Sequence, residues 1–202
     1  MNKPFYPLTA YLAGFLLFSL LFSACGVKEV TLNVKERKAL PKNSEAFLLL
    51  YASSNFEVQE INETNFERIL LPALKDEQLL SRGQLLRDAL QKEVRPTLVM
   101  SPERIFRRNP PTGLKDFFYR VKYELEVDYV LLYVEQQLHT FQTNPEAIGT
   151  KGTFLLMDAR DLGVAWSAKV NATASRFSNE KVIIKALAPD IKEALAESGM
   201  RF

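Results

Sequence analysis

The sequence contains only one cysteine and one histidine. A lone cysteine cannot form a disulfide within the chain, so the fold depends on its hydrophobic core. The lone histidine, His139, has no second histidine or free cysteine with which to complete a zinc site. The sequence also lacks glycine-rich phosphate loops, the G-x-S-x-G nucleophile turn and the H-E-x-x-H zinc motif. We therefore expect a protein with no metal, no cofactor and no enzymatic activity.

A strong charge of one sign is also absent, because 26 basic side chains face 24 acidic ones. Such a balance creates no field that would attract nucleic acid or another polyanion. The chain of 202 residues has 14 phenylalanines and 7 tyrosines, which are enough for a sizeable core. These numbers favour one globular domain without a nucleic-acid partner.

The single cysteine, Cys25, follows an apolar stretch from about Leu8 to Phe22. That stretch has the length of a secretory signal and is short for a membrane span, and Lys3 gives it a positive start. The segment resembles a bacterial lipoprotein signal. The resemblance implies that residues 1–24 are a signal peptide and that Cys25 is the lipid anchor, carrying diacylglycerol and palmitate.

Two other interpretations of this segment stay open. Cleavage by an ordinary signal peptidase after Ala24 needs a small residue at the −3 position, where Phe22 is bulky. An uncleaved membrane anchor would be longer and would end in a basic flank, which is absent here. Gly26 stands where an aspartate would retain a lipoprotein at the inner membrane. By the same resemblance, its presence implies the outer membrane, with the protein facing the periplasm.

The rest of the chain divides into a tether and one domain. Residues 25–44 are charged and show no sustained periodicity, which predicts a lipidated tether. Residues 45–202 then form the periplasmic domain. Short apolar runs predict strands at 46–51, 97–100, 128–134, 153–157 and 164–177. Helical spacing of apolar residues predicts helices near 66–74, 81–94, 112–125 and 179–197.

This order of elements predicts a single-domain α/β sandwich, in which helices pack on a mixed sheet of about five strands. Ser81 and Gln84 have the spacing of a capping box and would begin the second helix. The last strand alternates between small apolar and polar residues, so one face is buried and the other is solvated. Its predicted core face consists of Val164, Trp166, Ala168, Val170, Ala172 and Ala174.

Three segments together resemble a group of envelope proteins. A helix leads directly into the apolar strand that begins at Val127–Leu131. A hairpin over 154–166 has an Asp-x-x-x-Gly turn and a return strand that bears Trp166, and a long helix closes the chain. The group contains the curli-secretion lipoprotein, the lipoprotein activators of penicillin-binding proteins and the amino-terminal domain of TolB. The resemblance implies a non-catalytic protein that acts by binding or assembly.

A basic loop is the candidate contact surface outside the anchor. It surrounds Pro110 and Pro111, and it carries Arg104, Arg107, Arg108 and Lys115. Such a cluster suits the phosphates of lipids or an acidic partner, although a loop that is merely solvated has the same composition.

Two functions fit these observations. The first is a lipid-anchored accessory or assembly factor of an outer-membrane or cell-wall complex. Its partners would be the membrane through Cys25, other envelope proteins and, as a candidate, further copies of itself. The alternative is a lipid-binding auxiliary lipoprotein of an envelope transport system, suggested by the apolar side chains and the basic loop.

Overall fold

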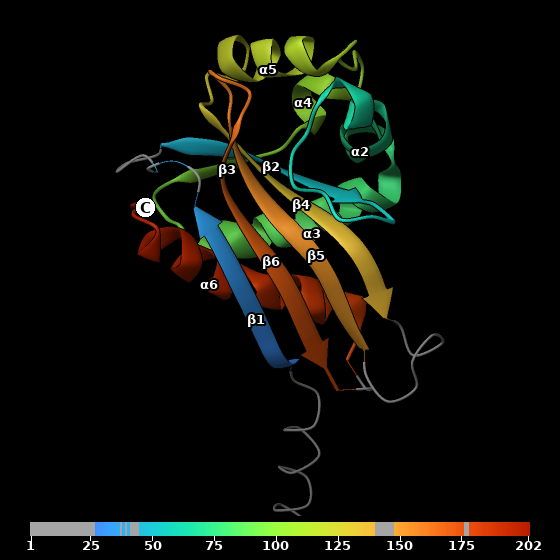
Figure 1. Ribbon diagram of the computed structural model, residues 1–202, viewed down its shortest axis with the longest axis vertical. Coiled ribbons are helices and arrows are strands. Elements are labelled where there is room, and N and C mark those ends of the chain that lie inside the picture. Colours follow the sequence, from blue (N-terminus) through green and yellow to red (C-terminus); the bar gives the residue numbers. More distant parts are fainter. Residues whose placement is uncertain (1–26, 37, 39, 41–44, 140–147, 176–177) are drawn as a thin grey trace, which may run out of the picture.

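Six strands form one mixed sheet in the computed structural model, which describes residues 27–36, 38, 40, 45–139, 148–175 and 178–202 (Figure 1). The sheet order is β1-β6-β5-β4-β2-β3. Strand β2 is parallel to both of its neighbours, β3 and β4, whereas the pairs β4–β5, β5–β6 and β6–β1 are antiparallel. The strands are β1 (Val27–Glu36), β2 (Ala46–Ser53), β3 (Leu98–Met100), β4 (Tyr129–His139), β5 (Ile148–Asp158) and β6 (Val164–Ala174).

The predicted mixed sheet in a single α/β domain is confirmed, but it has six strands rather than five. The additional strand is β1, which lies within the predicted tether of residues 25–44. It pairs antiparallel with β6 from Val27 to Glu36, so the prediction of a tether is wrong for these residues. Val30 and Leu32 pack against the core from this strand. These apolar residues recur at every second position, as expected for a strand. Charged residues flank this short stretch, which is why the sequence was interpreted as a tether.

Helices cover the sheet on both faces (Figure 1). Helices α3 and α6 pack on one face, while α2, α4 and α5 pack on the other face over β2 and β4. Their bounds are α2 (Glu63–Lys75), α3 (Glu77–Glu93), the short α4 (Glu103–Phe106), α5 (Leu114–Tyr123) and α6 (Glu180–Glu197). No helix in the described part of the chain is long and apolar enough to cross a membrane.

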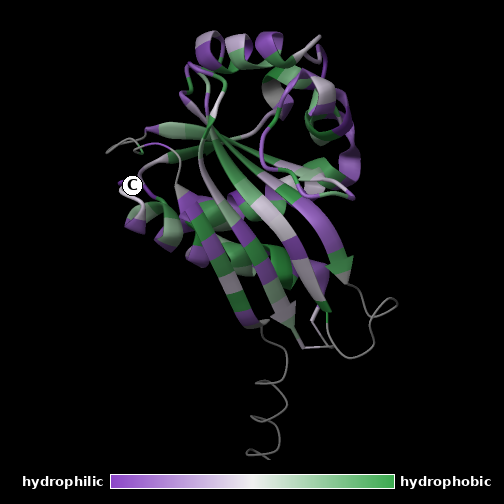
Figure 2. Ribbon diagram, viewed as in Figure 1, coloured by the Kyte–Doolittle hydropathy of each residue, from purple (hydrophilic) through white to green (hydrophobic). Residues whose placement is uncertain are grey.

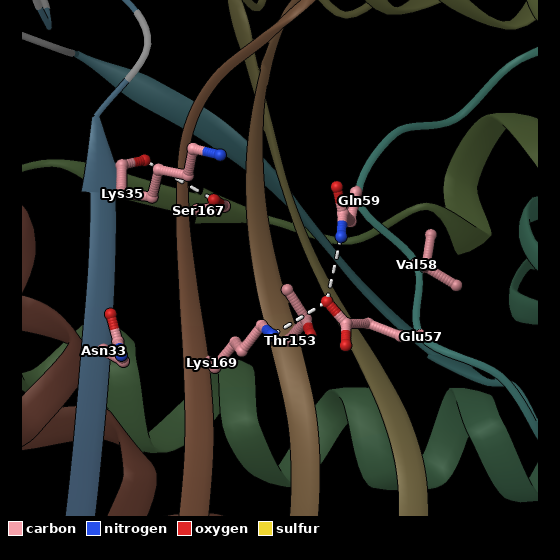
Figure 3. A pocket seen from close by; sticks show the side chains of 8 residues that line it. All are labelled: Asn33, Lys35, Glu57, Val58, Gln59, Thr153, Ser167 and Lys169. Atoms are coloured by element: carbon pink, nitrogen blue, oxygen red, sulfur yellow. Dashed lines mark hydrogen bonds and ion pairs between the residues drawn. The ribbon is translucent and has the colours of Figure 1, made fainter.

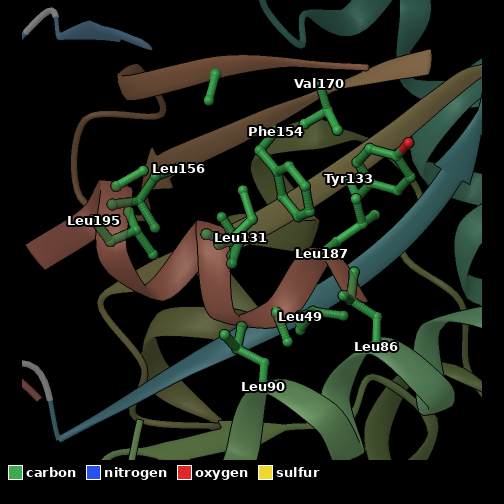
Figure 4. Packing of buried hydrophobic residues seen from close by; sticks show 14 of the residues in the cluster. Leu49, Leu86, Leu90, Leu131, Tyr133, Phe154, Leu156, Val170, Leu187 and Leu195 are labelled. Carbon is green, nitrogen blue, oxygen red and sulfur yellow. The ribbon is translucent and has the colours of Figure 1, made fainter. Parts of the chain in front are cut away.

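Two hydrophobic clusters follow from these layers. The first lies between the sheet and helices α3 and α6, where Leu86 and Leu187 meet Leu131 and Phe154 of the sheet (Figure 4). The second joins the opposite faces of β2 and β4 to α2 and α5. Strands β2 and β4 are therefore buried on both faces, which explains their continuous apolar sequences.

Helix α3 begins earlier than its sequence suggested. Its N-cap is Asp76, whose Oδ1 accepts hydrogen bonds from the backbone N–H groups of Gln78 (2.8 Å) and Leu79 (3.0 Å). The predicted capping box from Ser81 is wrong, because Ser81 lies inside the helix and is exposed. A capping box does exist at the start of α2, where Asn62 and Asn65 hydrogen-bond each other's backbone N–H groups.

The predicted core face of β6 is confirmed from Trp166 to Ala174, but Val164 is an exception. Five alternate residues of β6 belong to the cluster beneath α3 and α6: Trp166, Ala168, Val170, Ala172 and Ala174. An irregularity in the pairing between Leu156 and Met157 inserts one residue at this point of β6. Val164 therefore faces the other way and joins the second cluster.

Part of the second face of the sheet is polar, and the described helices leave it uncovered. Strands β1 and β6 alternate between hydrophilic and hydrophobic residues along this region (Figure 2). The exposed side chains on this face include those of Thr31, Asn33, Lys35, Lys169 and Asn171. Below, this region is called the open face.

Candidate functional site

The predicted anchor, Cys25, lies outside the described residues, and the first described strand, β1, begins two residues later at Val27. Ala174 pairs with both Val27 and Ile148, so these three residues mark one end of the sheet, here called the Val27 end. The opposite end holds the start of β4 and helix α5, and it is called the α5 end (Figure 1). The two ends lie at opposite poles of the long axis.

The four predicted contact residues lie near the α5 end. Arg107 and Arg108 are exposed, and the Arg107 guanidinium lies 3.7 Å from the Glu77 carboxylate. Lys115 is exposed in the first turn of α5. Arg104 lies on α4, and its side chain is outside the described residues. The structure therefore places this group near one pole of the domain, away from the strand end that follows Cys25 (Figure 1).

A buried arginine that the sequence analysis did not single out holds this loop in place. The Arg120 guanidinium donates hydrogen bonds to the backbone carbonyls of Asn109 (2.6 Å) and Ile105 (3.1 Å). It also pairs with Glu124 at 3.2 Å and stacks over the Phe106 ring at 4.8 Å. These contacts connect α4 and the loop to α5.

Helix α5 presents two aromatic side chains to solvent beside this basic group. Tyr119 and Tyr123 are 60% and 66% exposed, and their ring centroids lie 4.8 Å apart. They are four residues apart in a helix, so they share one face. Exposed aromatic rings beside cationic side chains are the composition that protein interfaces favour.

A second polar constellation lies inside the domain, between the sheet and α3. The Glu135 carboxylate accepts hydrogen bonds from Tyr51 (2.9 Å) and Arg82 (2.8 Å), and a longer one from Thr150 (3.3 Å). The Tyr133 hydroxyl hydrogen-bonds Thr150 at 2.8 Å. Arg82 also pairs with Glu180, the first residue of α6. One guanidinium thus joins the sheet to both helices that cover it.

Burial governs the protonation of this constellation. Burial raises the pKa of Glu135, and the neighbouring Arg82 charge opposes that rise. Burial, followed by the Glu135 charge, also raises the pKa of Tyr51, so its hydroxyl stays protonated and donates a hydrogen bond to the carboxylate. Every polar partner named here makes a hydrogen bond or an ion pair. The arrangement therefore stabilises the packing of α3 and α6.

A cavity of about 250 Å³ opens on the open face (Figure 3). The Lys169 ammonium lies 2.9 Å from Glu57 Oε1, and the Gln59 amide donates to the same oxygen at 3.1 Å. The hydrogen bond from Lys169 lowers the pKa of Glu57, so this carboxylate is charged at neutral pH. The lining residues are Asn33, Lys35, Glu57, Val58, Gln59, Thr153, Ser167 and Lys169.

One lining residue, Thr153, has no evident structural reason for its hydroxyl. Its side chain is 4% exposed, and Oγ1 has no hydrogen-bond partner among the described residues. A buried hydroxyl without a partner destabilises a fold, so its presence needs an explanation, such as a bound water, ion or ligand. The sequence analysis missed this cavity. The polar residues of β6 were the available signal, but their partners on β1 and on the loop after β2 are distant in sequence.

Among the described residues, no cluster of three or more histidine, cysteine or acidic side chains is arranged to hold an ion. The His139 side chain lies outside the described residues.

No protein-family model matches the sequence, and no curated protein sequence matches it either. Solved structures do match. The PelC dodecamer from Paraburkholderia phytofirmans has 14% sequence identity and a TM-score of 0.50, covering 86% of this chain and 100% of that chain. A point variant of that dodecamer gives the same two values, covering 83% of this chain and 97% of its own.

A third solved structure, the lipoprotein GNA1162 from Neisseria meningitidis, has 18% identity and a TM-score of 0.39. That match covers 75% of this chain and 98% of the other. At 14% identity, the PelC matches establish a shared fold.

Proposed function

We propose that this protein is a lipid-anchored lipoprotein of the bacterial envelope that acts without catalysis, as an accessory or assembly factor of an outer-membrane or cell-wall complex. Its anchor is Cys25, modified by diacylglycerol and palmitate after removal of residues 1–24. The domain faces the periplasm and needs no cofactor. The fold shared with PelC supports this proposal, as does the resemblance to the group of envelope proteins described above.

The single observation that carries the proposal is the position of β1. Val27 already pairs with Ala174 in the sheet, so only Gly26 separates the predicted anchor from the domain. Ten residues of strand span about 33 Å, which places the far end of β1 that distance from the anchor. A lipid on Cys25 would hold the Val27 end against the membrane and point the α5 end away from it.

This orientation changes the role proposed for the basic loop. Arg107, Arg108 and Lys115 would face away from the leaflet that holds the anchor, and the α4 backbone that carries Arg104 lies near the same pole. Together with Tyr119 and Tyr123, they would form a surface for an envelope protein rather than for the lipids of the same membrane. Contact with a partner protein thus becomes the proposed role of these residues.

A second copy of the same chain is the first partner to test. PelC forms a dodecamer, and this chain shares its fold. Strand β1 is also an edge strand of ten residues, and long free edges are sites where further strands pair.

We expect the chain without residues 1–25 to form a species larger than a monomer in light scattering. The physical reason is the free edge of β1, which can pair with a second chain. Chemical cross-linking in intact cells provides the matching measurement for the full-length protein. A strict monomer by light scattering, together with no cross-linked partner in cells, would contradict the proposed assembly role.

The alternative of a lipid-binding auxiliary lipoprotein gains less support from the structure. The cavity on the open face is lined mainly by polar and charged side chains, which do not suit an acyl chain. A second cavity of about 400 Å³, between α3 and α6, is lined by Glu77, Gln78, Ser81, Arg82, Leu85, Glu180 and Lys181. Native mass spectrometry that finds lipid bound beyond the anchor would favour this alternative.

A further inference from the structure

We propose that the cavity on the open face is a binding site for an oxyanion, carried by a polar ligand rich in hydroxyl groups. Lys169 and Lys35 would hold the anion, and Thr153 would hydrogen-bond it. In the free protein, Glu57 occupies the anion's place. The inference does not depend on the proposed function, because it rests only on residues that line the cavity.

The charges of the cavity favour an anion. Lys35 and Lys169 bring two positive charges, and Glu57 brings one negative charge. Lys169 pairs with Glu57, whereas Lys35 makes no ion pair with a carboxylate in the described part of the chain. The cavity therefore carries one uncompensated positive charge, at a place where two strands present their lysines on the same face.

Thr153 supplies the independent observation. It pairs directly with Lys169 across β5 and β6, so the two side chains are neighbours on the open face (Figure 3). Its buried hydroxyl has no partner among the described residues, whereas valine would fill the same space without a polar atom. A hydroxyl beside an ammonium group is a suitable pair of donors for a carboxylate or phosphate oxygen.

Glu57 competes with the ligand anion for the Lys169 ammonium, and its position allows it to move away from the cavity. It lies on the loop between β2 and α2, and it is partly exposed, as is Lys169. An ion pair between exposed side chains is weak, because solvent screens the charges. A ligand anion can therefore replace Glu57 as the ion-pair partner of Lys169 and hydrogen-bond the Thr153 hydroxyl beneath.

The remaining lining residues indicate the body of the ligand. The amides of Asn33 and Gln59 and the Ser167 hydroxyl can each donate or accept, as sugar or glycerol hydroxyls require. A cavity of about 250 Å³ has room for one small polyol unit. Both a glycerophosphate headgroup and an acidic sugar have this chemistry.

Calorimetric titration of the full chain in a nonionic detergent tests the proposal, with sn-glycerol 3-phosphate and glucuronate as separate probes. We expect the wild type to bind at least one probe, and Lys169→Met to weaken that affinity at least tenfold, about what loss of a charge-assisted hydrogen bond causes. Glu57→Gln should strengthen it about fivefold, because a repelling charge is removed. Thr153→Val should weaken it without lowering the melting temperature.

Two exposed residues near the cavity provide matched controls. Lys151 lies on β5 outside the lining, and Glu60 lies on the same loop as Glu57. We expect Lys151→Met and Glu60→Gln to leave the affinity unchanged. Binding of one probe identifies a phosphate or a carboxylate as the preferred anion, and equal binding of both supports the shared oxyanion chemistry. The proposal is overturned if neither the wild type nor Glu57→Gln binds, or if Lys151→Met weakens binding as much as Lys169→Met.

Discussion

Replacement of Trp166 by alanine is expected to lower the free energy of unfolding by about 4 kcal/mol, as truncation of a fully buried large aromatic does. Trp166 is completely buried in the cluster between the sheet and helices α3 and α6. Its Nε1 also donates a hydrogen bond to Ser198 Oγ at 3.0 Å, just after the end of α6. The variant therefore loses both the packing of β6 and one connection to the closing helix.

Urea denaturation followed by circular dichroism measures this loss. Trp166→Phe serves as the comparison variant, because it keeps most of the apolar volume but loses part of the ring packing and the hydrogen bond, of which the hydrogen bond contributes about 1 kcal/mol. A loss below about 1 kcal/mol in the alanine variant would mean that the site is not packed as described, because such truncations cost several times more.

Replacement of Glu135 by alanine is expected to lower the free energy of unfolding by about 3 kcal/mol, as loss of one partner from a buried ion pair does. The carboxylate of Glu135 is almost fully buried and accepts hydrogen bonds from Tyr51, Arg82 and Thr150. Its removal leaves the buried Tyr51 hydroxyl without its acceptor. Arg82 keeps Glu180, so part of its compensation survives.

Glu135→Gln keeps the shape of the side chain but removes its charge, so urea denaturation of this variant isolates the effect of the charge. Burial raises the pKa of Glu135 above its ordinary value of 4.5, so the folded protein holds this proton more tightly than the unfolded chain. The associated stability is fully present below pH 4.5 and is lost as the pH rises through the raised pKa. Glutamine cannot lose a proton, so we expect Glu135→Gln to gain stability relative to the wild type from pH 4.5 to pH 8. A constant difference across this range would contradict the assigned direction.

Much of the fold could be predicted from local sequence patterns. Strands β2 and β4 are continuous apolar runs, and each lies between two helical layers, where such runs belong. The alternation of β6 located its core face, because the period of a strand is two and one face is buried. The predicted start of helix α6 near residue 179 agrees with the structure, in which Asn179 is the N-cap. Its side-chain oxygen accepts a hydrogen bond from the Val182 N–H at 3.1 Å.

The errors also have physical causes. Strand β1 was missed because its apolar residues are interleaved with Lys28, Glu29, Lys35 and Glu36, so its composition is that of a linker. What makes it a strand is the pairing with β6, a long-range contact that local composition does not report. The predicted start of helix α3 was too late in the sequence. Asp76 directly follows Lys75, so a single residue is both the C-cap of α2 and the N-cap of α3.

The candidate cavity could not be predicted because three distant segments build it. Lys35 and Lys169 become neighbours only through the pairing of β1 with β6, and Glu57 approaches from the loop after β2. The Glu135 constellation was missed for the same reason. Its carboxylate lies at the end of an apolar run, and its partners Arg82 and Tyr51 are 53 and 84 residues away.

The most direct test of the central claim is the intact mass of the protein extracted with detergent from outer membranes, measured beside a Cys25→Ala variant. The account predicts a mass that matches residues 25–202 plus acyl chains, and the loss of that species in the variant. It also predicts that protease treatment leaves the strand after the anchor intact, because Val27 is already paired in the sheet. An unacylated mass that retains residues 1–24 would contradict the account, because the Val27 end would then not be held at the membrane by a lipid.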